Sequence, residues 1–213
     1  MSAIKPLTVW VHGQGPNPFK VLITLEELGI PYKAITIENP KDESFLKINP
    51  NGRLPAIQDP NANDLILWES GAIVEYIVET YDKENKLTFT EGPEKWYLKQ
   101  YLHFQMSGQG PYFGQHVWFH KFHPEDVPSA KKRYDEQTLR VFEVLNTILE
   151  GKEYLVGDKF TYADLVFIPW DRVVDAVSKD MVEKAGGEKK FPNFFAWNNR
   201  LMARPSVKKL YGL

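Results

Sequence analysis

The turn Asn-Pro-Asn-Gly-Arg-Leu-Pro at residues 49–55 could bind an extended peptide. A proline that enters a strand cannot donate a backbone hydrogen bond to the neighbouring strand. If the Leu54–Pro55 bond is cis, the backbone N–H and C=O of Leu54 can point out of the sheet and pair with a peptide ligand. An ordinary trans proline at the start of a strand is the alternative, and both interpretations fit the turn.

Glu69 and Ser70 stand directly before a stretch with helical spacing, Ile73, Val74 and Ile77. A helix N-terminus presents unpaired N–H groups and a partial positive charge, which favour a bound carboxylate. Ser70 could donate its hydroxyl to that carboxylate, and Glu69 could pair with an ammonium group. Together they suit the α-carboxylate and α-amine of an amino acid. The alternative is that Ser70 is a plain helix cap beside an exposed acid.

Asn17 follows the first strand-like run, and its amide N–H could donate a hydrogen bond to a thiolate and lower the pKa of the thiol. The same residue is a good helix N-cap, with Pro18 at the first helical position. Both roles can coexist, because the amide has separate donor and acceptor ends. The chain has no cysteine, which excludes disulfides, Cys-ligated zinc, iron–sulfur clusters and a cysteine nucleophile. Any reacting sulfur must therefore come from a ligand.

His116 and His120 are four residues apart, a spacing that would place them on one face of a helix, as in some zinc sites. The chain offers no cysteine and no Glu between them, and Pro124 lies close by. We therefore expect no metal site and interpret the pair as aromatic-rich packing or as part of a ligand wall. Nearby, residues 131–133 are most simply a solvated helix face, from which Arg133 could reach an anionic ligand at a domain or subunit boundary.

The elements that must position these residues fall into two regions. The first region gives, in order, a strand at 7–11, a helix at 18–28 ended by Gly29 and Pro31, a strand at 33–37, a short helix at 43–48, a hairpin of 56–58 with 65–68, and a helix from Ser70. A crossover between the first two strands implies parallel pairing, and the hairpin adds an antiparallel edge. This is the thioredoxin-like layout.

The second region is helical, near residues 93–118, 128–150, 161–177 and 191–203, with a capping motif at Thr161–Asp164. We therefore predict an α/β thioredoxin-like domain at 1–81, a linker at 82–92 and an all-α domain at 93–213.

Composition limits the possible functions. The 213 residues carry a net charge of −2, so no basic excess favours a nucleic-acid partner. Residues 100–120 have no formally charged side chain but are rich in Gln, His and Gly, so we expect no membrane span. The N-terminal residues lack the apolar core of a secretory signal, and we expect a cytoplasmic protein.

Four segments in this order resemble the cytosolic glutathione transferases over essentially the whole chain: the strand followed by the helix of Asn17, residues 49–57, residues 68–73 and residues 161–164. Residues 16–21, 107–111, 114–115 and 130–134 look like the branch that contains the transferase-like domain of the fungal nitrogen regulator and the bacterial nu-class disulfide-bond reductases. The resemblance implies the glutathione transferase fold, glutathione as co-substrate and a homodimer.

The resemblance also implies roles for single residues. Leu54 would pair with the cysteinyl part of glutathione, Glu69 and Ser70 would hold its γ-glutamyl end, and Asn17 would lie near the sulfur. The implied glutathione-binding set is Asn17, Lys41, Arg53, Leu54, Pro55, Glu69, Ser70 and Arg133, with Lys41 near the glycyl carboxylate and Arg133 reaching in from the partner subunit. The implied wall for a second substrate, a small electrophile or disulfide, is Tyr112, Phe113, His116, Trp118 and Trp170.

Many transferases steady the thiolate with Tyr, Ser or Cys, whereas the loop after the first strand here offers no Tyr and no Cys. This difference leaves Asn17 in that role and favours disulfide exchange over strong aryl conjugation, because two glutathione molecules can supply both sulfurs. Two alternatives stay open: a glutathione-binding regulatory or stress protein with little turnover, and a chaperone-like dimer without a ligand.

Overall fold

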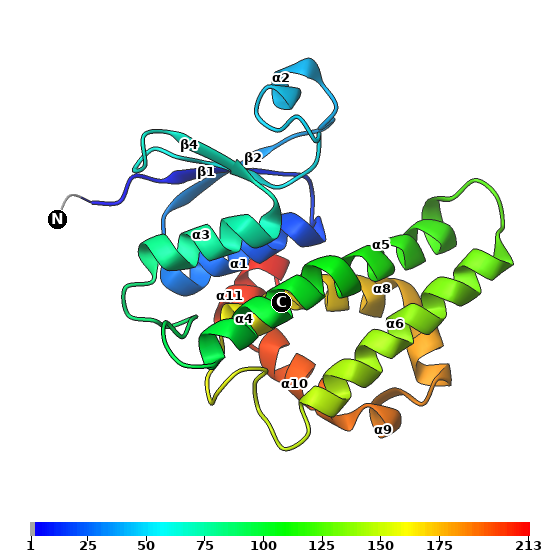
Figure 1. Cartoon of the computed structure of the whole chain (residues 1–213). Coiled ribbons are helices and arrows are strands. Elements are labelled where there is room, and N and C mark those ends of the chain that lie inside the picture. Colours follow the sequence, from blue (N-terminus) through cyan, green and yellow to red (C-terminus); the bar gives the residue numbers. More distant parts are fainter. Residues whose placement is uncertain (1–2) are drawn as a thin grey trace. The chain divides into compact units, whose positions relative to one another are not determined.

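The computed structural model describes residues 3–213 and divides into two compact units (Figure 1). The first unit contains the residues up to Thr88 together with Pro205–Leu213, and the second contains Phe89–Arg204. The sequence interpretation placed residues 205–213 in the helical region. They group with the first unit because helix α11 (Pro205–Tyr211) packs on α1 (Pro16–Leu28), where the rings of Phe19 and Tyr211 lie 4.8 Å apart.

The first unit is built on a four-stranded sheet in the order β2-β1-β3-β4. The strands are β1 (Leu7–Val11), β2 (Tyr32–Thr36), β3 (Ala56–Asp59) and β4 (Leu65–Trp68). β1 and β2 are parallel, whereas β3 is antiparallel to both β1 and β4. The thioredoxin-like layout predicted from the hairpin and the crossover is confirmed.

Helices α1 and α3 (Ser70–Tyr81) lie on the same side of this sheet (Figure 1). The main core of the unit joins apolar side chains of β1 and β3 with those of α1 and α3, among them Val9, Leu25, Ile57 and Ile73. The short helix α2 (Glu43–Leu46) contributes Phe45 to a smaller cluster with Trp10 and Ala56. Successive side chains of β1 point to opposite faces of the sheet, so this strand contributes apolar side chains to both faces.

The starts of both helices differ from the prediction. Helix α1 begins at Pro16 with Gly15 in the N-cap position, so Asn17 lies inside the first turn and does not cap it. Pro16 and Pro18 both fit this turn, because N–H groups there have no helical partner. Likewise, Ser70 is the first residue of α3, and Glu69 takes the N-cap position, where its side chain makes no capping hydrogen bond. The predicted stop at Gly29 is confirmed, with φ at 65°.

The second unit is helical. It contains α4 (Glu94–Phe104), the π-helical turn η1 (Gln105–Gln109), α5 (Gly110–Val117), the π-helical turn η2 (Trp118–Phe122), α6 (Pro128–Ile148), α7 (Tyr162–Leu165), α8 (Ile168–Lys184), α9 (Gly187–Lys190) and α10 (Pro192–Met202). Phe142 of α6 packs against Phe113 and Phe194 in the core. Within residues 3–213, no helix is both long and apolar enough to cross a membrane.

The capping motif of α7 is confirmed as a capping box between Thr161 and Asp164. The buried Asp164 carboxylate also accepts hydrogen bonds from the Leu155 N–H and from Trp197 Nε1, each at 2.9 Å. This carboxylate therefore joins the loop before α7 to α10, a structural role.

Candidate functional site

The register of the sheet brings the three predicted segments to one end of it. Trp10 stands opposite Ala56 in β1 and β3, and Ala56 stands opposite Trp68 in β3 and β4. Three segments therefore meet at the same end of the sheet: the one that leaves β1 toward Asn17, the one that enters β3, and the one that leaves β4. β2 is parallel to β1 and ends there as well. The segment that follows β2, which includes Lys41, therefore begins at the same end of the sheet.

The Leu54–Pro55 peptide bond is cis. β3 begins only at Ala56, so the Leu54 backbone lies outside the strand, and its side chain is half-buried. Asn49 holds the turn before it: its Nδ2 donates to the Arg53 carbonyl at 2.7 Å, and its Oδ1 accepts from the Asn51 N–H at 3.0 Å. Leu54 is thus presented at the end of the sheet by a turn with internal hydrogen bonds.

Lys41 lies against the same turn. Its Nζ donates to the Asn51 carbonyl at 3.0 Å, and a Cβ added at Gly52, where φ is 58°, would come within 2.8 Å of the Lys41 Cδ. Glycine at this position therefore permits both the backbone turn and the close approach of the lysine. Lys41 and Arg53 are exposed, so both cations are open to an anionic ligand.

Glu69 has an unusual backbone conformation, with φ at 74° and ψ at 112°. A residue with a Cβ rarely occupies this region, and such strain persists where the surrounding structure or the function requires it. The Glu69 carbonyl accepts the Ile73 N–H at 2.9 Å and so begins helix α3, while its side chain is exposed. Ser70, the next residue, is buried.

Sequence reasoning missed Lys20. Its side chain is only 1% exposed, although it is a lysine in helix α1, and its Nζ lies 3.4 Å from Ser70 Oγ. Burial lowers the pKa of Lys20 from 10.5 to about 7, and the charge of Glu69 opposes this shift. The available signal was a lysine within the apolar run from Phe19 to Leu25. With a pKa near neutrality, Lys20 is an ammonium in only part of the molecules at pH 7, and in that form it adds positive charge beside the N-terminus of α3.

Asn17 is half-buried in the first turn of α1, one helical turn before Lys20. The described structure therefore places Asn17, Leu54, Glu69 and Ser70 on segments that meet at one end of the sheet. These groups are an amide, a backbone segment outside the strand, a carboxylate and a hydroxyl.

The residues predicted to form a second-substrate wall all lie in the helical unit. For Phe113 and His116 that prediction is wrong, because both side chains are completely buried. Phe113 packs edge to face on Phe142, and His116 contacts Ser178 and Asp135, since α5 turns one face into the core.

The other three wall residues have some exposed surface. Trp118 is 47% exposed, Tyr112 lies under Arg140, and Trp170 packs beside Gly110 and Gly114. Arg133 is exposed on α6. These residues remain available to a ligand or a partner.

Comparison with known proteins identifies the family of the chain. Residues 5–79 match the model of the glutathione S-transferase N-terminal domain, and residues 111–205 match the model of its C-terminal domain. The glutathione S-transferase-like protein gedE of Aspergillus terreus is 44% identical, over 99% of this chain and 96% of its own.

Solved structures agree as well. The glutathione transferase URE2P8 from Phanerochaete chrysosporium, crystallised with oxidised glutathione, superposes with a TM-score of 0.91 at 37% identity, over 100% of this chain and 96% of its own. Ure2p5 from the same fungus, cocrystallised with 1-(S-glutathionyl)-2,4-dinitrobenzene, gives 0.89 at 40% identity, over 99% and 95%. The chain belongs to the glutathione S-transferase family.

Proposed function

We propose that this protein binds glutathione at the end of the sheet and catalyses disulfide exchange with it. The observation that carries the proposal is the strained Glu69 beside the buried pair Ser70 and Lys20. Glu69 suits the α-amine of the γ-glutamyl end. Ser70, the α3 N-terminus and the Lys20 ammonium suit its α-carboxylate.

The cysteinyl and glycyl parts of glutathione have counterparts at the same end of the sheet. The Leu54 N–H and C=O suit the cysteinyl backbone, as in the pairing of an extended peptide with a sheet edge. Lys41 and Arg53 are exposed cations beside the preceding turn and suit the glycyl carboxylate. Two carboxylates, one amine and one peptide backbone each have a counterpart of the correct chemistry.

Asn17 is then the group that acts on the sulfur. Its amide N–H donates to the glutathione thiolate and lowers the pKa of the thiol, so more of the nucleophilic form exists at neutral pH. That thiolate attacks one sulfur of a substrate disulfide and displaces the other as a thiolate. A second glutathione thiolate attacks the mixed disulfide, which yields oxidised glutathione and two substrate thiols in all.

Conjugation is the second candidate reaction. URE2P8 was crystallised with oxidised glutathione, a product of disulfide exchange, whereas Ure2p5 was crystallised with a conjugate of glutathione and dinitrobenzene. The exposed Trp118 and the half-buried Tyr112 offer apolar surface that suits a flat electrophile. In this reaction the same thiolate attacks an aryl carbon and releases its leaving group.

The test is glutathione-dependent turnover of a small model disulfide beside turnover of 1-chloro-2,4-dinitrobenzene. We expect the disulfide to be reduced faster, and Asn17→Ala to lose most of both activities while it still binds glutathione. Tight binding of glutathione with no turnover of either substrate would instead identify a binding protein on this fold.

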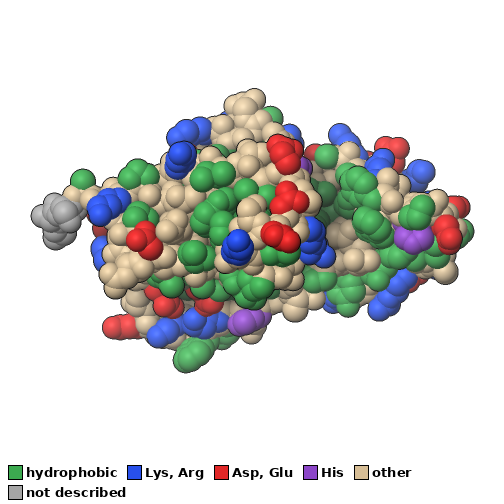
Figure 2. All heavy atoms as spheres, turned by 90° about the horizontal axis from the view of Figure 1, so that it is seen from above, with side chains coloured by type: hydrophobic (Ala, Val, Ile, Leu, Met, Phe, Trp, Pro, Cys, Tyr) green, Lys and Arg blue, Asp and Glu red, His purple; other side chains and the backbone are tan. Residues whose placement is uncertain are grey.

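We also propose that the protein is a cytoplasmic homodimer in which Arg133 of one subunit reaches the glutathione of the other. Edge strand β4 exposes Leu65, Ile66 and Trp68 by 36–42%, and Figure 2 shows hydrophobic side chains lying open between charged ones on the face that it draws. An exposed apolar edge is a common place for association. Sedimentation velocity tests the dimer, and a monomer at micromolar concentration would contradict it.

A further inference from the structure

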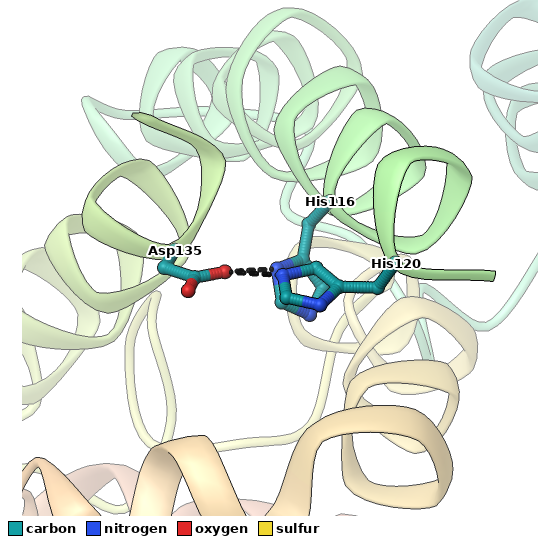
Figure 3. A group of neighbouring side chains, drawn as sticks. All are labelled: His116, His120 and Asp135. Carbon is teal, nitrogen blue, oxygen red and sulfur yellow. Dashed lines mark hydrogen bonds and ion pairs between the residues drawn. The ribbon is translucent and has the colours of Figure 1, made fainter. Parts of the chain in front are cut away.

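A second cluster of chemically capable side chains lies in the helical unit, independent of the proposed glutathione site. Figure 3 shows His116 of α5, His120 of η2 and Asp135 of α6 pointing toward one another. Asp135 Oδ1 lies 2.9 Å from His116 Nδ1 and 2.8 Å from His120 Nε2. One nitrogen from each histidine and one carboxylate oxygen all lie within 4.8 Å of one another.

We propose that His116, His120 and Asp135 form a binding site for a divalent transition-metal ion of the zinc class. Two imidazole nitrogens and one carboxylate oxygen are ligands that Zn²⁺ takes in proteins, with a water completing the tetrahedron. Bonds of roughly 2.0–2.1 Å would separate tetrahedral ligands by about 3.3 Å. The two observed contacts of 2.8–2.9 Å therefore need to widen by only about half an ångström on binding.

The environment of His116 supports a ligand role. Its side chain is completely buried, and its Nδ1 has no partner of good hydrogen-bond geometry within the described part of the chain, although it faces the Asp135 carboxylate. Its other nitrogen, Nε2, contacts Ser178 Oγ. Metal-binding histidines commonly use the second ring nitrogen in this way, which fixes the ring and leaves the first nitrogen for the metal.

The cluster is also reachable. His120 is 28% exposed and Asp135 is 29% exposed, so an ion can enter from their side while His116 closes the other. Without metal, the same contacts would serve only to hold α6 against the α5–η2 segment.

The experiment uses untagged full-length protein, stripped with a chelator and free of glutathione. It is titrated with Co²⁺, whose visible absorption reports tetrahedral coordination, and then with Zn²⁺ in competition. We expect one equivalent of Co²⁺ with tetrahedral bands in the wild type and their loss in His120→Gln and Asp135→Asn. His123→Gln is the matched control, because His123 contacts the Glu125 carbonyl and is not part of the cluster. It should bind as the wild type does.

Two further measurements distinguish metal binding from a purely structural contact between α6 and the α5–η2 segment. Ser178→Ala should weaken metal affinity by roughly 10–100-fold, because it removes the contact that orients His116. Zn²⁺ should raise the melting temperature of the wild type and of His123→Gln but not that of His120→Gln, since a ligand stabilises only the state that binds it. No uptake of Co²⁺ or Zn²⁺ by the wild type, or equal uptake by a folded His120→Gln, would overturn the proposal.

Discussion

The backbone of Glu69 gives a prediction that separates the effect of strain on stability from the effect of the carboxylate on binding. With φ at 74°, this residue occupies a conformation that costs a residue with a Cβ roughly 1–2 kcal/mol and costs glycine almost nothing. Glu69→Gly removes both the strain and the carboxylate, whereas Glu69→Ala removes the carboxylate and keeps the strain. The difference in stability between the two variants therefore reports the strain, less the effect of glycine on the unfolded chain.

Glycine gives back part of this gain because it makes the unfolded chain more flexible, by roughly 0.5–1 kcal/mol. We expect Glu69→Gly to be more stable than Glu69→Ala by about 1 kcal/mol, or roughly 2–4 °C in melting temperature for a chain of this size. The charge of Glu69 also acts on Lys20, but both variants lose that effect equally, so it cancels in the comparison.

Binding should fall in both variants. A hydrogen bond to a charged partner contributes about 1.5–3 kcal/mol, so glutathione should bind roughly 10- to 150-fold more weakly. Thermal unfolding without ligand measures the first effect, and calorimetric titration with reduced glutathione measures the second. A Glu69→Gly variant no more stable than Glu69→Ala would refute the strain argument, and unchanged glutathione affinity would refute the assignment of Glu69 to the γ-glutamyl amine.

Three further predictions concern other residues of the first unit. Asn17→Ala should lower kcat for disulfide reduction by more than about tenfold with little change in glutathione affinity. Steady-state kinetics measures both, and an equal loss of kcat and affinity would contradict the prediction. The pKa of Lys20 is about 7 in the folded protein and 10.5 for an ordinary exposed lysine, so the unfolded chain binds more protons between these two pH values. In urea unfolding, the free energy of unfolding of the wild type should therefore rise from pH 7 to 9 by up to about 1.4 kcal/mol per pH unit. That of Lys20→Met should not change with pH over this range, and equal slopes for the two proteins would contradict the prediction. Asp59 accepts hydrogen bonds from Tyr76 and Tyr81, so Asp59→Ala should lose about 3 kcal/mol of stability in the same assay, and a loss below about 1 would show the network to be weak.

The sequence predicts the strands and the sheet well, because these depend on local patterns. Alternation and turn residues mark β1 and the hairpin, and the crossover rule then gives the parallel pair. The helix starts are less certain, since Pro16 and Pro18 both suit a first turn and only the packed structure decides between them. The position of α11 depends on contacts with α1 from the far end of the chain, which local patterns do not contain.

The candidate site divides in the same way. Asn17, Leu54, Glu69 and Ser70 stand in short motifs whose chemistry is visible in the sequence. Lys20 becomes interesting only when its burial is known, because lysines on helices usually extend into water.

The histidine pair shows the same limit. The spacing of His116 and His120 indicates a shared face, but the carboxylate that completes the cluster comes from Asp135 on another helix. Sequence reasoning therefore expected no metal, and only the packing of α5, η2 and α6 brings the three side chains together.

In the proposed complex, the end of the sheet binds glutathione with its sulfur at Asn17. The most direct measurement is the pKa of the bound thiol, followed by the ultraviolet absorbance of the thiolate during a pH titration of the glutathione complex. We expect a pKa below the value of about 8.5 typical of a free thiol, and a return toward that value in Asn17→Ala. A bound thiol that titrates like free glutathione, or identically in wild type and variant, would contradict it.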